Sequence, residues 1–151
     1  MAETSLTGKD VIKVNNRLIT ALADGDVGAL TYPNNLVEVK TGKSGNSIYA
    51  LNETGRQCEV TLRVIRGSAD DRYLNGQIAL QQSDFAAFPL LTGEIVKRIG
   101  DGQGNVKDDT YILSGGVFSK LPEAKTNTDG DTDQSVVTYN LKYTNAPRTI
   151  G

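Results

Sequence analysis

A glycine-lysine-serine run is the first feature of this sequence that could do chemistry. Gly42-Lys43-Ser44 matches the end of a phosphate-binding P-loop, in which backbone amides and a lysine hold phosphate oxygens. A P-loop also needs a glycine five positions before Gly42, where this chain has Val37, and a helix after the serine. Nucleotide binding is therefore not predicted.

Oxygen-bearing side chains that could hold a calcium ion alternate in one polar segment, at Asn127, Asp129, Asp131 and Asp133. A calcium-binding EF-hand loop starting at Asp129 would need a glycine at Gln134 and a glutamate at Asn140. We interpret the segment as a solvated acidic loop, with weak cation binding as the alternative. The adjacent acids at 70–71 and 108–109 indicate a helix start and a strand entry, not an acid–base pair.

Histidine and cysteine, which supply the nitrogen and sulfur ligands of metal sites and many catalytic groups, are almost absent from the sequence. The chain has no histidine, which excludes a histidine-based triad, metal ligand or general base. Cys58 is the sole cysteine, so the chain can form neither an internal disulfide nor a cysteine-rich zinc site. Its period-two spacing with Val60, Leu62 and Val64 predicts a buried strand residue in a protein made in a reducing compartment. No catalytic residue, cofactor or metal is predicted, and an enzyme is the least favoured class.

Alternating apolar and polar residues predict a mainly β chain with one helix. Asn15-Asn16 predicts a tight hairpin turn, since asparagine tolerates the left-handed conformation. Ser68 is the predicted N-cap of a helix to Gln82, with Leu74 and Ile78 on its buried face. The predicted strands are 11–14, 17–22, 29–32, 36–40, 57–66, 90–99, 109–120 and 135–144. A bulge or bend is expected at Gly115-Gly116, and residues 121–134 are expected to form a loop.

Length and charge narrow the class of protein. The 151 residues predict one domain, residues 1–151, with a long protruding loop at about 41–55. The net charge of -2 argues against a basic nucleic-acid binder and a membrane-surface protein, and neither a signal peptide nor a spanning segment is expected. Residues 101–133 have a net charge of -4 and the rest +2. This asymmetry suits head-to-tail self-association, or is merely a polar loop region.

Several blocks of the sequence resemble the tail tube proteins of bacteriophages with contractile tails. These blocks, which together span nearly the whole chain, are residues 26–37, 39–46, 62–71, 91–98, 131–137 and 145–148. The resemblance implies an antiparallel β-sandwich or barrel-like subunit with one flanking α-helix. It further implies hexameric rings, stacked into the hollow tube through which the genome leaves the virion. The implied partners are other copies of the chain, the tail sheath, baseplate and terminator proteins, and DNA in transient passage. Assembly in the host cytoplasm is expected, without membrane contact.

Two groups of residues are candidates for contacts in such a tube. The predicted loop offers backbone donors, cations and apolar side chains for ring stacking: Thr41, Lys43, Asn46, Ile48, Tyr49, Leu51 and Arg56. Strands 37–40 and 57–66 are candidates for a polar inner wall, in which the lumen-lining residues are Glu38, Lys40, Glu59, Thr61 and Arg63. A wall too rich in lysine and arginine would hold DNA by neutralising its phosphates.

Two alternatives remain open. The first is the tube protein of a bacterial secretion or contractile injection system. The second is a monomeric β-barrel module that binds a carbohydrate or small ligand. The absence of tryptophan and an aromatic content of 6% argue against sugar binding, which uses stacked aromatic rings.

Overall fold

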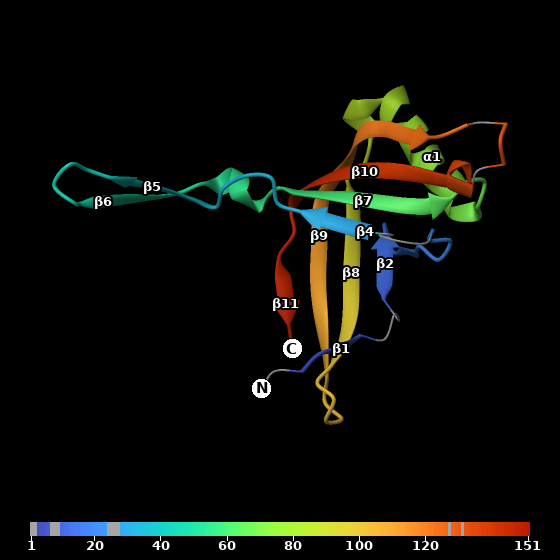
Figure 1. Ribbon diagram of the computed structural model, residues 1–151. Coiled ribbons are helices and arrows are strands. Elements are labelled where there is room, and N and C mark those ends of the chain that lie inside the picture. The colour runs from blue at the N-terminus through green and yellow to red at the C-terminus, as the bar shows by residue number, and fades with distance from the viewer. Residues whose placement is uncertain (1–2, 7–9, 24–27, 127, 131) are drawn as a thin grey trace.

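Eleven antiparallel strands and one α-helix make up the part of the chain that the computed structural model describes, residues 3–6, 10–23, 28–126, 128–130 and 132–151 (Figure 1). The strands are β1 (Ser5–Leu6), β2 (Val11–Val14), β3 (Arg17–Leu18), β4 (Gly28–Thr31), β5 (Val37–Thr41), β6 (Ser47–Leu51), β7 (Cys58–Ile65), β8 (Leu91–Gly100), β9 (Val106–Ala124), β10 (Val136–Asn145) and β11 (Arg148–Ile150). Helix α1 spans Ala69–Ser83, and short 3₁₀ turns lie at Glu53–Arg56, Phe85–Ala87 and Thr132–Ser135. The fold is mainly β and barrel-like without a closed barrel, as predicted.

A single long strand, β9, joins the two halves of the main sheet, whose order is β3-β2-β8-β9-β10-β7-β4. Its first half pairs with β8 and its second half with β10. Figure 1 shows β8 and the first half of β9 running upright while β10, β7 and β4 cross them. The two halves thus enclose the core from two directions, in the manner of orthogonal sheet packing.

The predicted bend in β9 is confirmed at Gly115 and Gly116. Gly115 has a φ of 65°, which glycine adopts without steric cost. A Cβ on Gly116 would lie 2.4 Å from Cε1 of the buried Tyr143, so no larger residue fits there. The β8–β9 register shifts between Leu91 and Gly93, opposite this point.

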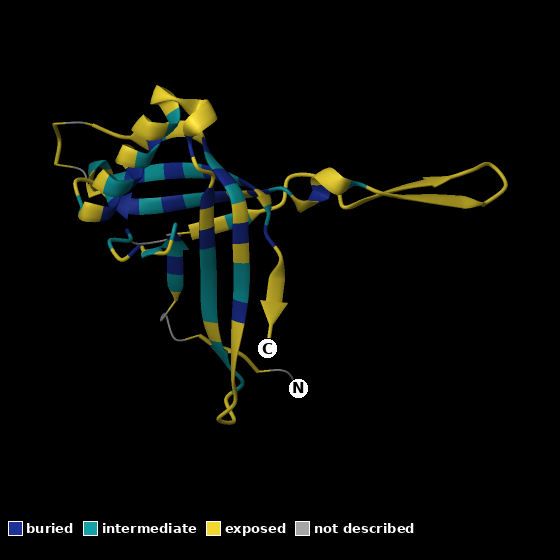
Figure 2. Ribbon diagram, turned by 180° about the vertical axis from the view of Figure 1, so that it is seen from behind, coloured by how far each residue is buried: buried dark blue, intermediate teal, exposed yellow. Residues whose placement is uncertain are grey.

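The core follows the predicted alternation. Along β7 and β10 every second residue is buried: Cys58, Val60, Leu62, Val64, Val137, Tyr139, Leu141 and Tyr143 (Figure 2). Helix α1 adds Leu74 and Ile78, and Ser68 caps it by accepting a hydrogen bond from the Asp71 amide, as predicted. Gln81 pairs with both the amide and the carbonyl of Phe118, beyond the point where β8 leaves β9. None of the described helices is long and apolar enough to cross a membrane.

The N-terminal segment 17–23 spans the open side of the barrel. Asn15 and Asn16 have φ of 51° and 65°, which confirms the predicted turn between β2 and β3. The chain then reaches the far edge of the sheet, where Leu22 bridges Val64. The predicted strand 17–22 is therefore wrong beyond Leu18.

The predicted loop 121–134 is also wrong in its first four residues, because β9 continues to Ala124. Pro122 lies where the register between β9 and β10 shifts, between the pairs Lys120–Asn140 and Glu123–Thr138. A proline is tolerated at such a bulge because no ladder hydrogen bond is required of it.

Candidate functional site

Strands β5 and β6 form a two-stranded hairpin that extends away from the main sheet (Figure 1). The turn between them is closed by hydrogen bonds from the Gly42 amide to the Asn46 carbonyl, at 2.7 Å, and from the Gly45 amide to the Gly42 carbonyl, at 3.0 Å. Gly45 has a φ of 86°. Residues 42–46 are thus a short hairpin turn. The protrusion expected as a loop at 41–55 is an arm that begins at Val37.

The hairpin has two chemically different faces. Because paired residues of an antiparallel ladder share a face, the pairs Val37–Leu51 and Val39–Tyr49 lie together on one side. We call these four residues the apolar arm face. The opposite face has the pairs Glu38–Ala50 and Lys40–Ile48. All residues of both strands are exposed, with Tyr49 at 72%.

The root of the hairpin is packed, in contrast to the arm. A Cβ on Gly55 would lie 2.7 Å from the Leu36 Cα, which shows how closely the two backbones approach. The Asn52 amide donates to the Leu36 carbonyl at 2.8 Å. Asn34 donates to the Thr54 carbonyl at 3.2 Å. The arm therefore projects from a fixed base.

An apolar hollow of about 490 Å³ lies at this root, between the base of the hairpin and the end of β10. Its lining residues are Tyr32, Asn34, Leu36, Gly55, Arg56, Asn145, Ala146 and Pro147. The Tyr32 hydroxyl donates to the Ala146 carbonyl at 2.6 Å, which fixes one wall. Arg56 pairs with Glu53. We call this cavity the root hollow.

The face of β7 and β10 opposite the core is polar. Cross-strand pairing places Glu59 beside Lys142, Thr61 beside Asn140, and Arg63 beside Thr138. On the other side of β10, Lys120 and Glu123 of β9 extend the same rows beside Asn140 and Thr138. The charged residues of this polar sheet face are three cations and two acids: Arg63, Lys120, Lys142, Glu59 and Glu123.

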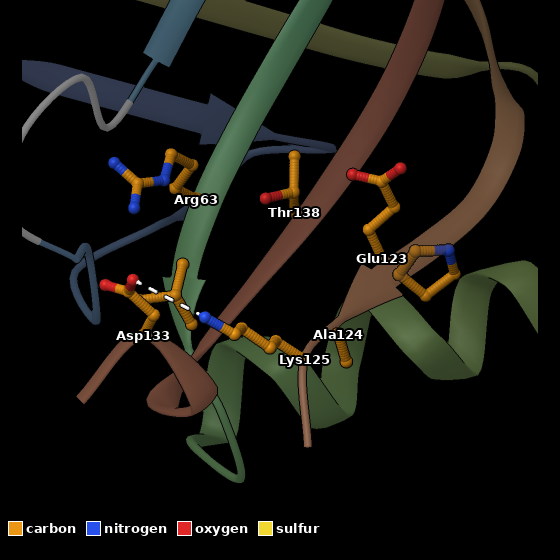
Figure 3. A pocket seen from close by; sticks show the side chains of 8 residues that line it. Arg63, Glu123, Ala124, Lys125, Asp133 and Thr138 are labelled. Atoms are coloured by element: carbon orange, nitrogen blue, oxygen red, sulfur yellow. Dashed lines mark ion pairs between the residues drawn. The ribbon is translucent and has the colours of Figure 1, made fainter. Parts of the chain in front are cut away.

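A hollow of about 620 Å³ opens on one end of the polar sheet face (Figure 3). Arg63 of β7 and Glu123 of β9 lie on either side of Thr138. Lys125 and Asp133 form an ion pair at 4.0 Å across its edge. Charges of both signs line this hollow, so it is not a site for an ion of one sign.

The structure places all predicted stacking residues on the hairpin or its root: Thr41, Lys43, Asn46, Ile48, Tyr49, Leu51 and Arg56. The predicted lumen-lining residues are divided. Glu59, Thr61 and Arg63 lie together on β7, whereas Glu38 and Lys40 lie on the hairpin, in a separate sheet. Whether any of them faces a lumen stays a prediction.

Sequence reasoning missed two parts of these surfaces. Val37 and Val39 belong to the apolar arm face, whereas the sequence predicts strand 36–40 and the loop 41–55 as separate elements. Thr138, Asn140 and Lys142 belong to the polar sheet face. The alternation of β10 already placed these three on its non-core side, so the signal was present in the sequence.

The acids of residues 101–133 do not form one patch. Asp101 and Asp108 lie near the turn between β8 and β9, whereas Glu123 lies at the opposite end of β9, and Asp129 and Asp133 follow that end in the chain. The acids are thus spread over both ends of β9, and whether the charge asymmetry serves head-to-tail association stays a prediction.

The structure adds no support for a reactive Cys58 or for a metal site. Burial raises the pKa of the Cys58 thiol to about 11, so it stays protonated near neutral pH. The described residues contain no group of three or more Cys, Asp or Glu side chains arranged to hold a metal ion. Two members of the alternating acidic segment, Asn127 and Asp131, lie outside the described residues.

Comparison with known proteins gives matches in structure alone. No protein-family model and no curated protein matches the sequence. A chain of the sheath–tube complex of an extracellular contractile injection system, PVC, in its extended state, matches with a TM-score of 0.63 and 10% identity, over 94% of this chain and 88% of the other. A chain of the anti-feeding prophage baseplate matches with a TM-score of 0.51 and 12% identity, over 99% and 93%. The chain therefore has a fold that occurs in the sheath–tube and baseplate complexes of contractile injection systems.

Proposed function

We propose that this chain is the building block of a contractile-tail tube, in which sixfold rings stack into a hollow conduit. In a bacteriophage this tube conducts the genome out of the virion; in an injection system, the alternative, it conducts that system's cargo. The fold similarity to chains of two contractile injection assemblies supports a structural, tail-related role with tube, sheath and baseplate partners. The role needs no catalytic group.

The observation that carries the proposal is the surface that the single chain leaves uncovered. The accessible surface is 9878 Å². A compact monomer of 16.2 kDa exposes about 7,500 Å². The surplus of roughly 2,400 Å² equals about three times the area that one partner contributes to a standard protein interface. A subunit with neighbours in its own ring and in the rings above and below requires several such interfaces.

The hairpin accounts for part of this surplus. An isolated two-stranded hairpin is at best marginally stable in water, because it has no core to bury its side chains. This one also exposes a set of large apolar residues: Val37, Val39, Ile48, Tyr49 and Leu51. We assign the hairpin to contacts between subunits of successive rings.

The polar sheet face is the proposed lumen wall. Its charges are of both signs. Glu59 lies beside Lys142, and Glu123 of β9 and Arg63 of β7 lie on opposite sides of Thr138 in β10. A wall with many cations would bind the phosphates of DNA, and the free-energy cost of releasing the DNA would depend strongly on salt. A wall with balanced charges avoids this binding. Glu38 and Lys40 on the hairpin are not part of this face, so their exposure to the lumen would depend on how rings stack.

Electron microscopy of the purified chain at high concentration tests the proposal. Rings of sixfold symmetry or hollow tubes of constant diameter are expected. A matched variant replaces residues 38–50 by a two-residue Asn-Gly turn, which rejoins the paired residues Val37 and Leu51. It should stay folded, with the far-ultraviolet circular dichroism of β structure, but form no stacks. A wild-type chain that stays monomeric at all concentrations, or a variant that makes normal tubes, contradicts the proposal.

A further inference from the structure

No described residue outside the hairpin covers the apolar arm face, all four residues of which are exposed. Val37, Val39, Tyr49 and Leu51 lie side by side in the β5–β6 register, and these residues are 42–72% exposed. An apolar sheet face of this kind is normally buried against a second layer. Tyr49 is the largest of the four, and tyrosine is among the residues that most often dominate interface energies.

The root hollow has the complementary chemistry. Leu36, Ala146 and Pro147 supply apolar walls, and Asn34 and Asn145 add amide groups at its edge. A volume of about 490 Å³ admits an aromatic side chain, and an amide can pair with its hydroxyl. Tyr32 already uses its own hydroxyl on the Ala146 carbonyl, so the wall is formed before any ligand arrives.

Tyr49 lies away from the root hollow of its own subunit. The hairpin extends away from the root (Figure 1). Tyr49 pairs with Val39, three residues beyond Leu36, a separation of roughly 10 Å along an extended strand. A second copy of the chain can supply the missing partner. Because donor and acceptor surfaces differ, the contact is heterologous, and it repeats from subunit to subunit.

We propose that the apolar arm face of one subunit seats in the root hollow of the next, with Tyr49 as the anchor. The occupant is a second copy for two reasons. The accessible surface exceeds that of a compact monomer by about three times the area that one partner contributes to a standard interface, and both halves of the contact occur on every chain. This inference rests on the proposed tube assembly and specifies one of its contacts. The opposite face of the hairpin, with Glu38 and Lys40, stays on the outside of the contact.

Disulfide bridging between copies tests this contact. A disulfide requires Cα atoms within roughly 7 Å, so a bridge between positions 36 and 49 cannot form inside one chain. The native Cys58 is fully buried and does not interfere. Full-length Tyr49→Cys is mixed with size-tagged Leu36→Cys, and in parallel with size-tagged Pro147→Cys, and each mixture is oxidised. At least one mixture should give a mixed dimer on a denaturing gel. A double variant that combines Tyr49→Cys with the acceptor substitution that bridges should give a ladder of higher multimers.

The matched control is Ala50→Cys, on the opposite face of the same hairpin. Its mixtures should bridge several-fold less than those of Tyr49→Cys. Bridging of Tyr49→Cys to itself, equal bridging of the control, or no bridge at either acceptor position overturns the contact. If rings or tubes form in these preparations without bridges, the proposed function stands and only this contact is overturned. If no bridges form and the wild-type chain also forms no assemblies, both fail.

Discussion

Asp70 and Arg17 form an ion pair that fastens the N-terminal segment to the first turn of α1. The distance between Arg17 Nε and Asp70 Oδ1 is 3.2 Å, and the Asp70 side chain is almost fully buried. The same carboxylate accepts hydrogen bonds from the amides of Thr20 and Ala21, at 2.9 and 2.8 Å. One helix side chain therefore holds the segment that spans the open side of the barrel, where strand pairing alone leaves the backbone unsatisfied.

Replacing this carboxylate should weaken the whole fold. Asp70→Asn keeps one acceptor oxygen for three donors, so we expect the free energy of unfolding to fall by about 1–3 kcal/mol. Urea denaturation measures it. Asp84→Asn, an exposed acid at the other end of α1, is the control and should change stability by less than about 0.5 kcal/mol. Equal effects of the two variants would show that the Asp70 contacts contribute nothing.

The pH dependence of stability gives a second measure of the same contact. Burial of Asp70 opposes ionisation, but the amides of Ala21 and Thr20 and the Arg17 guanidinium outweigh it and lower the pKa of the carboxyl. A lowered pKa in the folded state stabilises the fold above the unfolded-state value of about 4. This contribution is lost as the pH falls through the folded-state pKa. Asp70→Asn should therefore lose less stability than the wild type between about pH 5 and pH 2.

Glycine-to-alanine substitutions at the bend in β9 and inside helix α1 should have opposite effects on stability. At Gly116 the added Cβ collides with Tyr143, so Gly116→Ala should destabilise the chain by about 1–3 kcal/mol. At Gly76, inside α1, a Cβ meets nothing within 4 Å. Gly76→Ala should stabilise by about 0.5–1 kcal/mol, since alanine favours the helix. Thermal unfolding of both variants measures the difference, and a change of the same sign in both would be inconsistent with this account.

The C-terminal strand β11 depends on one arginine. Arg148 donates two hydrogen bonds of 2.8 Å to Asp109, and its guanidinium carbon lies 5.7 Å from the centroid of the Tyr111 ring. The bond to Arg148 lowers the pKa of Asp109. Lysine keeps the charge but cannot bind in this two-pronged way. In Arg148→Lys the β11 amides should exchange hydrogen about five- to tenfold faster, corresponding to about 1 kcal/mol. Arg98→Lys on β8 should leave β11 protection unchanged.

Local patterns predicted most of the fold, and the failures arise where distant segments decide the outcome. The alternation of β10, the cap at Ser68 and the turn at Asn15 each depend on a few neighbouring residues. The hairpin was missed because its strands find their register only with each other, across a five-residue turn. The polar composition of residues 121–134 predicts a loop, and only the bulge in the ladder to β10 lets the strand continue past Pro122.

The sequence predicted which residues belong to the candidate surfaces better than it predicted how those residues are divided between faces and sheets. Ile48, Tyr49 and Leu51 were correctly grouped as one protruding apolar set, but their division between two faces follows from the register with β5. Glu38 and Glu59 both alternate with apolar residues in strand-like segments. Sequence alone gives no reason to separate them, because which strands share a sheet depends on pairing between residues far apart in the chain.

Glu59 and Glu38 now provide a direct test of the proposed lumen wall. On the polar sheet face, Glu59→Lys removes one of two acids and adds a fourth cation beside Lys142. If this face lines the conduit, duplex DNA should be retained by the variant tubes at low salt and released as salt rises, because phosphate contacts depend steeply on ionic strength. Co-sedimentation of short DNA with assembled tubes at about 50 and 200 mM salt measures retention. Glu38→Lys makes the same charge change on the hairpin and should retain several-fold less DNA. Equal DNA retention by the two variants would show that the hairpin and the polar sheet face do not differ in access to DNA. No retention by Glu59→Lys in intact tubes would place the polar sheet face outside the lumen.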